Sequence, residues 1–82
     1  MNERMIFCKR LQREVAGLDE APLKGAIGQV ILENISAEAF NEWLEIQIKI
    51  INEERLDLSE ESAQERLYRQ MVAYLNLDDL VE

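Results

Sequence analysis

The sequence predicts a hairpin or extended N-terminal segment followed by three helices. Two observations support this arrangement. All three glycines and the only proline lie between Gly17 and Gly28, so glycine and proline punctuate only the N-terminal third of the chain. From Gly25 onward, apolar residues recur at the three- and four-residue steps of amphipathic helices. No linker, repeat or low-complexity tract interrupts the 82 residues, so we expect a single domain over residues 1–82.

Residues 4–11, with the sequence RMIFCKRL, fit two structures. The apolar run IFC favours a strand, and the turn residues that follow would complete a two-stranded hairpin over about 4–22. Phe7, Leu11 and Val15 also recur every four residues, which is typical of a helix. A lone hairpin is marginal in water, so it would have to lie against the helices. The residues alone leave both structures open.

The three helices are expected over about 25–34, 37–54 and 60–76. Ser36 is a residue type that caps helix N-termini, because its side chain can accept a hydrogen bond from a free backbone N–H group. The stretch DLS breaks the pattern after the second helix, and we expect Ser59 to cap the third. The short acidic tail NLDDLVE is expected to fray.

The chain has no histidine and one cysteine, which excludes several kinds of site. Ser-His-Asp and Cys-His catalytic sets, zinc sites with histidine or four thiolates, self-contained iron–sulfur clusters and internal disulfides cannot be built from it. Without a general base for neutral pH we expect no enzyme, although paired carboxylates could still do acid–base work. The N-terminus MNERMIFCKR contains neither a signal-peptide core nor a membrane span, so a cytoplasmic location is expected.

Charge is divided unevenly along the chain. Nine Lys and Arg residues face 17 Asp and Glu residues, a net charge of −8, with +1 in residues 1–30 and −9 in residues 31–82. Nucleic acids and anionic membranes are bound through Lys and Arg, so we expect neither as a partner. A hard cation or a partner with a basic face suits this charge. The alternative is that the acidity only keeps a small protein soluble.

Cys8 is the main candidate nucleophile. Lys9, Arg10 and Arg13 are close to it in sequence and would favour its thiolate, which peroxide can oxidise. The alternative is an inert, buried cysteine that packs as a small apolar residue beside Phe7. As a catalyst the thiol would lack its usual histidine base, and a peroxidase would lack a second, resolving thiol.

Carboxylates are the candidate metal ligands. Glu53, Glu54 and Asp57 cluster at the end of the second predicted helix, and Glu14 and Asp19 flank the glycine turn. Oxygen ligands suit hard or borderline divalent ions, including Fe²⁺. Without imidazole such a site would be weak and labile, and other metals would compete for it. A solvated acidic helix end is the alternative.

Arg13, Trp43 and Gln47 are candidates for a crevice or partner contact. Gln47 interrupts an apolar stripe one turn after Trp43, so it either pairs with a neighbouring polar group or lines a functional crevice. A protein–protein adaptor that binds no metal is therefore an alternative function. Its second or third helix would offer an apolar stripe, with Tyr68, Tyr74 or Trp43 as the anchor.

Several of these residues also carry a family resemblance. The segments IFCKRLQRE and IINEERL, with Gly17, Gly25, Gly28 and Trp43 in the same order, resemble the YggX-type Fe(2+)-trafficking proteins over about residues 5–75. These small bacterial proteins are also described as oxidative damage protection proteins. The resemblance implies an α+β fold, a short two-stranded antiparallel hairpin packed on three α-helices. It therefore favours a strand, not a helix, near the N-terminus.

The resemblance also implies a non-enzymatic function. The chain would move or buffer Fe²⁺ for the synthesis or repair of iron–sulfur clusters and protect these clusters from oxidation, with Cys8 associated with the protection. Ferrous iron and iron–sulfur proteins or their assembly machinery are then the expected partners, and we expect a monomer. The chain departs from the family at Lys24, where the family has Pro, and at Ile48, where it has Thr. The family's longer C-terminal extension is reduced to NLDDLVE.

Overall fold

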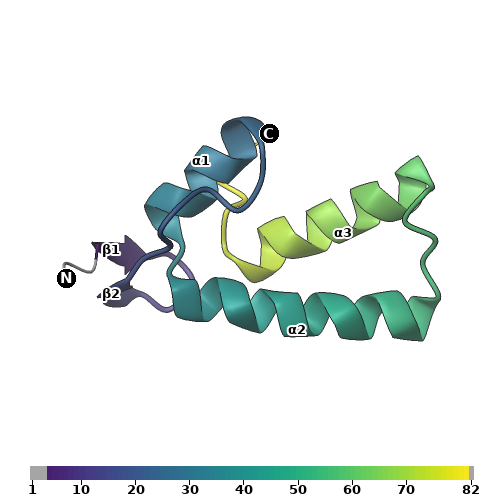
Figure 1. Ribbon diagram of the computed structural model, residues 1–82, viewed down its shortest axis with the longest axis horizontal. Coiled ribbons are helices and arrows are strands. Elements are labelled where there is room, and N and C mark those ends of the chain that lie inside the picture. Colours follow the sequence, from purple (N-terminus) through teal and green to yellow (C-terminus); the bar gives the residue numbers. More distant parts are fainter. Residues whose placement is uncertain (1–3, 82) are drawn as a thin grey trace.

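The computed structural model describes residues 4–81 and shows a hairpin and three helices (Figure 1). The elements follow the chain in the order β1 (Met5–Cys8), β2 (Arg13–Ala16), α1 (Gly25–Asn34), α2 (Ala37–Glu54) and α3 (Glu61–Tyr74). The predicted α+β fold class is confirmed. The molecule measures 40 × 24 × 21 Å, with the hairpin at one end of its long axis and the loop between α2 and α3 at the other (Figure 1).

Strands β1 and β2 pair in antiparallel register, with Cys8 opposite Arg13. Side chains alternate between the two faces of a strand. Accordingly, Cys8 is buried and Ile6 packs against the core, whereas Phe7 is 52% exposed on the other face. The tight turn contains Gln12 at φ 58°, and its N–H group donates to the Cys8 carbonyl oxygen (2.7 Å). The four-residue recurrence of apolar residues in this segment therefore does not mark a helix.

Helix α1 begins from a closely packed turn. A Cβ atom on Gly28 would lie 1.8 Å from the carbonyl oxygen of Leu23, so only glycine fits where the helix passes the preceding loop. Gly25 has φ +81°, a conformation that side chains disfavour. These two glycines fix the loop that ends at Leu23 against the start of the helix.

The N-terminal caps of α2 and α3 differ. The Ser36 hydroxyl oxygen accepts a hydrogen bond from the Ala39 N–H group (3.1 Å), so the predicted cap of α2 is confirmed. The predicted cap of α3 is wrong: Glu60 is the capping residue, and it makes no side-chain cap bond. Ser59 instead donates both its N–H (3.0 Å) and its hydroxyl (2.6 Å) to the Asp57 carboxylate. The nearby carboxylate competes for Ser59, so the loop and not the helix uses this side chain.

The C-terminal tail packs into the core, and the prediction that it frays is wrong. Helix α3 ends at Tyr74, and Asn76 adopts φ 61°, the left-handed conformation that commonly ends a helix. The N–H of Leu77 then donates to the Val72 carbonyl oxygen (2.9 Å), and the Leu77 side chain is fully buried. Asn76 thus reverses the chain and returns an apolar side chain to the core.

The core gathers side chains from the hairpin, all three helices and the tail. Its buried members are Cys8, Ile31, Ile35, Ala39, Phe40, Trp43, Met71, Val72, Leu75 and Leu77. Most of them lie toward the hairpin end of α2 and the C-terminal end of α3. The core therefore ties together segments that are far apart in sequence.

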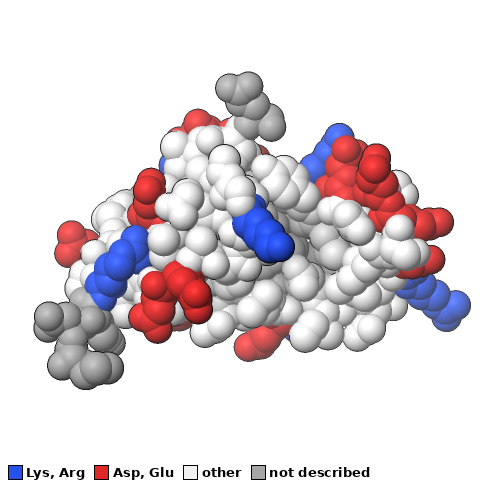
Figure 2. Space-filling view, turned by 45° about the horizontal axis from the view of Figure 1, so that its top comes forward, with Lys and Arg blue, Asp and Glu red and all other residues white. Residues whose placement is uncertain are grey.

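The opposite end of the molecule is acidic. Residues 53–66 hold six carboxylates and two guanidinium groups, a net charge of −4. Figure 2 shows acidic side chains gathered at the end where the loop between α2 and α3 lies. We call residues 53–66 the acidic end. Among residues 4–81, no helix has both the length and the apolar composition needed to cross a membrane.

Candidate functional site

Cys8 lies at the end of β1, against the N-terminus of α2. Its side chain is fully buried, and the Sγ atom accepts a hydrogen bond from the N–H of Ser36, the capping residue of α2 (3.3 Å). The next residue, Lys9, donates its N–H to the Asn34 carbonyl oxygen (2.8 Å), which holds the strand against the end of α1. The thiol is therefore placed where N–H groups and the positive end of the helix dipole converge.

This position has two opposing effects on the thiol. Burial raises the pKa of Cys8, but hydrogen bonds from the side chain and N–H of Ser36 and from the N–H groups of Leu11 and Arg10 lower it. The hydrogen bonds prevail, and the pKa lies below the ordinary value for cysteine. Cys8 thus combines the electrostatics of a reactive cysteine with the burial of a structural one.

The three bases near Cys8 in sequence pair with other groups. Lys9 Nζ lies 2.8 Å from Asp79 Oδ2, and Arg13 lies 3.4 Å from Glu38. The guanidinium of Arg10 stacks over the Tyr74 ring at 3.9 Å from its centre, a cation–π contact. Lys9 and Arg10 therefore connect the hairpin turn to α3 and the tail. The lowered pKa of the thiol comes from hydrogen bonds, and not from the side-chain charges that the sequence suggested.

The five candidate metal ligands fall into two separate groups. Glu14 is exposed on β2 and Asp19 is exposed in the loop after it. Glu53, Glu54 and Asp57 lie at the acidic end, which is the end of the molecule opposite the hairpin (Figure 1). Within residues 4–81, the structure contains no group of three His, Cys, Asp or Glu side chains placed to hold one metal ion.

Two carboxylates of the acidic end already have partners. Both oxygens of Glu54 accept hydrogen bonds from Arg66, through Nε and, at 2.6 Å, through a terminal nitrogen. This contact lowers the pKa of Glu54, and the hydrogen bonds from Ser59 lower the pKa of Asp57. Both groups are exposed and ionised at neutral pH. A cation at this end has to compete with Arg66 and Ser59 for their oxygens.

Trp43 and Gln47 line a groove of about 440 Å³ between α2 and α3. Trp43 forms the floor of the groove, because its side chain is almost entirely buried. The centre of its ring lies 6.1 Å from the centre of the Tyr74 ring. Gln47 is half-buried at the loop end of the groove. Arg13, the third candidate for this crevice, pairs with Glu38 near the hairpin instead. The polar interruption of the apolar stripe therefore coincides with a concave surface.

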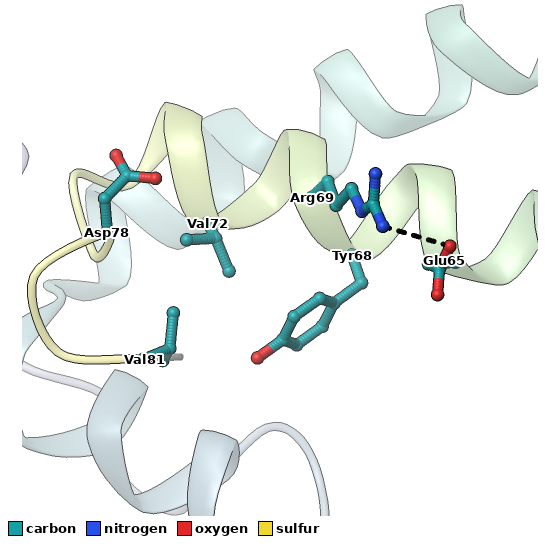
Figure 3. Close-up of a pocket in the computed structure, with 6 residues that line it drawn as sticks. All are labelled: Glu65, Tyr68, Arg69, Val72, Asp78 and Val81. Carbon is teal, nitrogen blue, oxygen red and sulfur yellow. Dashed lines mark hydrogen bonds and ion pairs between the residues drawn. The ribbon is translucent and has the colours of Figure 1, made fainter.

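A second pocket, of about 550 Å³, lies between α3 and the tail (Figure 3). Tyr68 points into it from α3, the side chain of Val72 lines it, and Val81 closes it from the tail. Arg69, at its edge, is paired with Glu65 of the preceding turn (3.3 Å). Sequence reasoning missed this pocket because the tail was expected to fray. The helix-ending asparagine between two leucines was the available signal.

Comparisons with known proteins agree on one family. The model of the family described as "Bacterial Fe(2+) trafficking" matches residues 1–82. A probable Fe(2+)-trafficking protein of Acinetobacter baumannii is 44% identical over 79 residues, covering 96% of this chain and 89% of that protein. Similar proteins of the same description occur in Hahella chejuensis, 44% identical over 73 residues (89% of this chain, 82% of that protein), and in a Marinomonas species, 42% identical over 71 residues (87% and 76%). The chain therefore belongs to the family of bacterial Fe(2+)-trafficking proteins.

Proposed function

We propose that this protein carries or buffers ferrous iron in the bacterial cytoplasm without catalysing a reaction. Membership of the Fe(2+)-trafficking family over the whole chain is the observation that carries the proposal. The net charge of −8 supports it, because exposed carboxylates attract a divalent cation. Carboxylate oxygens are ligands that suit Fe²⁺.

Iron is held loosely in this proposal. The carboxylates of the acidic end are exposed and are not grouped around one point. Arg66 also binds both oxygens of Glu54. Exposed Glu53 on α2 would supply the first oxygen ligand. Glu54 and Asp57 would add further ligands by giving up their hydrogen bonds with Arg66 and Ser59. A weak and labile site suits a carrier, because the ion must leave again for the receiving protein.

The receiving proteins would be iron–sulfur proteins or the machinery that assembles or repairs their clusters. Cys8 would contribute the protection against oxidation that this role requires. Its lowered pKa favours the thiolate, the form that peroxide attacks. Because the side chain is fully buried, the thiolate meets an oxidant only when the hairpin opens away from α2. Protection would then depend on a transient opening.

The test is an anaerobic titration of the reduced protein with Fe²⁺. Binding is monitored through the paramagnetic broadening of amide NMR signals. We expect saturable broadening centred on residues 53–66. Arg66→Gln frees Glu54 and should strengthen binding several-fold, whereas Glu53→Gln should weaken it. Arg13→Gln is the matched control, because it removes the same charge from an ion pair at the hairpin end.

Protection is tested separately with Cys8→Ser. This variant should bind Fe²⁺ as the unmodified protein does, yet lose the ability to preserve a client's iron–sulfur cluster under peroxide. Broadening spread over the whole surface, or no saturation, would reject the iron site. Equal cluster survival with the unmodified protein and with Cys8→Ser would reject the proposed role of Cys8 but leave the iron site standing.

A further inference from the structure

The groove between α2 and α3 is a concave apolar surface with an open rim. Trp43 and Met71 form its buried floor, and Leu44 on α2 forms one wall. Tyr68 on α3 forms the other wall and separates the groove from the pocket beside the tail. The loop that ends at Leu23 closes the groove at the hairpin end. Gly28 lets the Leu23 carbonyl approach the backbone of α1 closely, so this wall packs directly against the helix.

Large apolar side chains remain exposed around this groove. Leu23 is 42% exposed, Leu44 39% and Tyr68 38%, and Ile48, one turn beyond Leu44 on α2, is 58% exposed. Single exposed apolar residues are common on protein surfaces, but a group around one concavity marks a contact surface. The aromatic floor and wall provide the kind of anchor on which interface energy concentrates.

The charge around the groove restricts what can bind there. Its far end, at Gln47 and Gln64, leads to the acidic end with its net charge of −4, whereas Lys24 adjoins Leu23 at the hairpin end. Figure 2 shows a dense group of acidic side chains at the end where the loop between α2 and α3 lies, and other acidic side chains toward the hairpin end. Nucleic acid and anionic lipid are repelled by this surface. A second copy of the chain would bring its own net charge of −8 to the contact.

We propose that this groove docks a segment of a partner protein whose apolar side chains fill the groove and whose Lys and Arg side chains lie over the acidic end. The apolar contacts bind the segment and the charges orient it, with its basic part away from Lys24. The proposal goes beyond iron handling, because neither the groove nor its charge requires a metal ion.

Trp43 is the only tryptophan, so its fluorescence reports on the groove directly. The probe is a synthetic amphipathic helical peptide of leucine and lysine, added in the presence of a metal chelator. We expect a saturable change in fluorescence, with binding that weakens as salt is raised. A peptide of the same length made of leucine and glutamate should not bind.

Leu44→Gln should weaken binding of the leucine–lysine peptide about tenfold, the loss that one well-packed apolar contact causes. Leu23→Gln, on the facing loop, gives a second and independent variant. Met5→Gln is the matched control, because it also replaces an exposed apolar residue but lies on the hairpin. Circular dichroism verifies that all three variants remain folded.

Equal affinity of Leu44→Gln, Leu23→Gln and Met5→Gln for the peptide would overturn the proposal, as would equal binding of the leucine–glutamate peptide. Amide NMR shifts confined to residues 53–62, with none at groove residues, would show charge attraction alone and would also overturn the proposal. Dimerisation that Leu44→Gln abolishes would identify a second copy as the occupant instead. Because the chelator removes metal ions from the peptide assay, its outcome does not depend on whether the protein binds iron. The iron titration can therefore succeed or fail independently.

Discussion

The hairpin end and the acidic end of the molecule are stabilised in different ways. At the hairpin end, Cys8, Ser36 and Leu77 are fully buried. The Ser36 N–H donates to the Cys8 Sγ atom, and backbone hydrogen bonds join Lys9 to Asn34 and Leu77 to Val72. At the acidic end, every residue from 57 to 62 is exposed, and an exposed ion pair of Arg66 with Glu54 joins α3 to α2. The thiol is thus enclosed where packing is dense, and the carboxylates are presented where it is sparse.

This difference would separate folding from the proposed binding of iron. Exposed ion pairs contribute little to stability, so carboxylates at the acidic end can exchange partners without unfolding the chain. Buried groups are costly to disturb, so the thiol at the hairpin end is protected by the same contacts that hold the fold. Changes at the hairpin end should therefore affect stability, and changes at the acidic end should affect binding.

The largest expected effect is that of Leu77→Ala. Removing this fully buried side chain should lower the free energy of unfolding by about 2–5 kcal/mol, because it leaves a cavity in the core. Leu58→Ala, the same change at an exposed position of the acidic end, should cost less than about 0.5 kcal/mol. Urea unfolding followed by circular dichroism measures both. Equal small losses would mean that the tail does not pack as described.

Ser36→Ala should produce the next largest loss, about 1–2 kcal/mol, because the buried Ala39 N–H loses its capping partner. Ser59→Ala also removes a serine that precedes a helix, but this residue does not cap α3, so we expect a change of a few tenths of a kcal/mol at most. The comparison uses the same denaturation measurement. A cost for Ser59→Ala as large as that for Ser36→Ala would contradict the difference between the two caps.

A smaller effect concerns pH and Cys8. The pKa of the thiol is lower in the folded protein than in the unfolded chain, so its ionisation adds stability as pH rises through the folded pKa. That contribution is complete above the unfolded value of about 8.5 and is lost as pH falls through the folded pKa. The stability difference between the unmodified protein and Cys8→Ala should therefore grow from neutral to alkaline pH. A difference that shrinks on this path would place the folded pKa above the unfolded one.

The smallest stability effect is expected for Arg66→Gln, whose ion pair with Glu54 is exposed. Arg66 lowers the pKa of Glu54, so the contribution of the pair exists above the unfolded carboxyl pKa and is lost as pH falls through the folded one. Thermal unfolding at low and high salt should show a slight shift that salt removes. A large, salt-insensitive shift would show that Arg66 supports packing at this end.

Sequence reasoning succeeded where the signal was local. The helical period and the Ser36 cap depend on residues a few positions apart, and the structure bears them out. One local prediction failed: Ser59 does not cap α3, because the Asp57 carboxylate two residues away accepts its hydrogen bonds. Sequence reasoning also failed for the tail, where the buried position of Leu77 depends on a chain reversal at Asn76.

The candidate site divides in the same way. Residue types alone indicated a thiol, carboxylates and a polar residue within an apolar stripe, and the chain's charge pointed toward a cation or a basic partner. Which of these meet depends on contacts between distant segments. The N–H of Ser36, 28 positions from Cys8, bonds its Sγ atom, while Arg66, 12 positions from Glu54, binds its carboxylate.

By itself, the sequence determined the helices, the excluded chemistries, the charge and the family, because each follows from composition, short-range spacing or segment similarity. Only the tertiary structure decided that Cys8 is enclosed, that the tail completes the core and that α2 and α3 leave a groove between them. The physical reason is that burial and hydrogen bonding belong to pairs of surfaces. Those surfaces exist only once α2 and α3 have packed together with the hairpin and the tail.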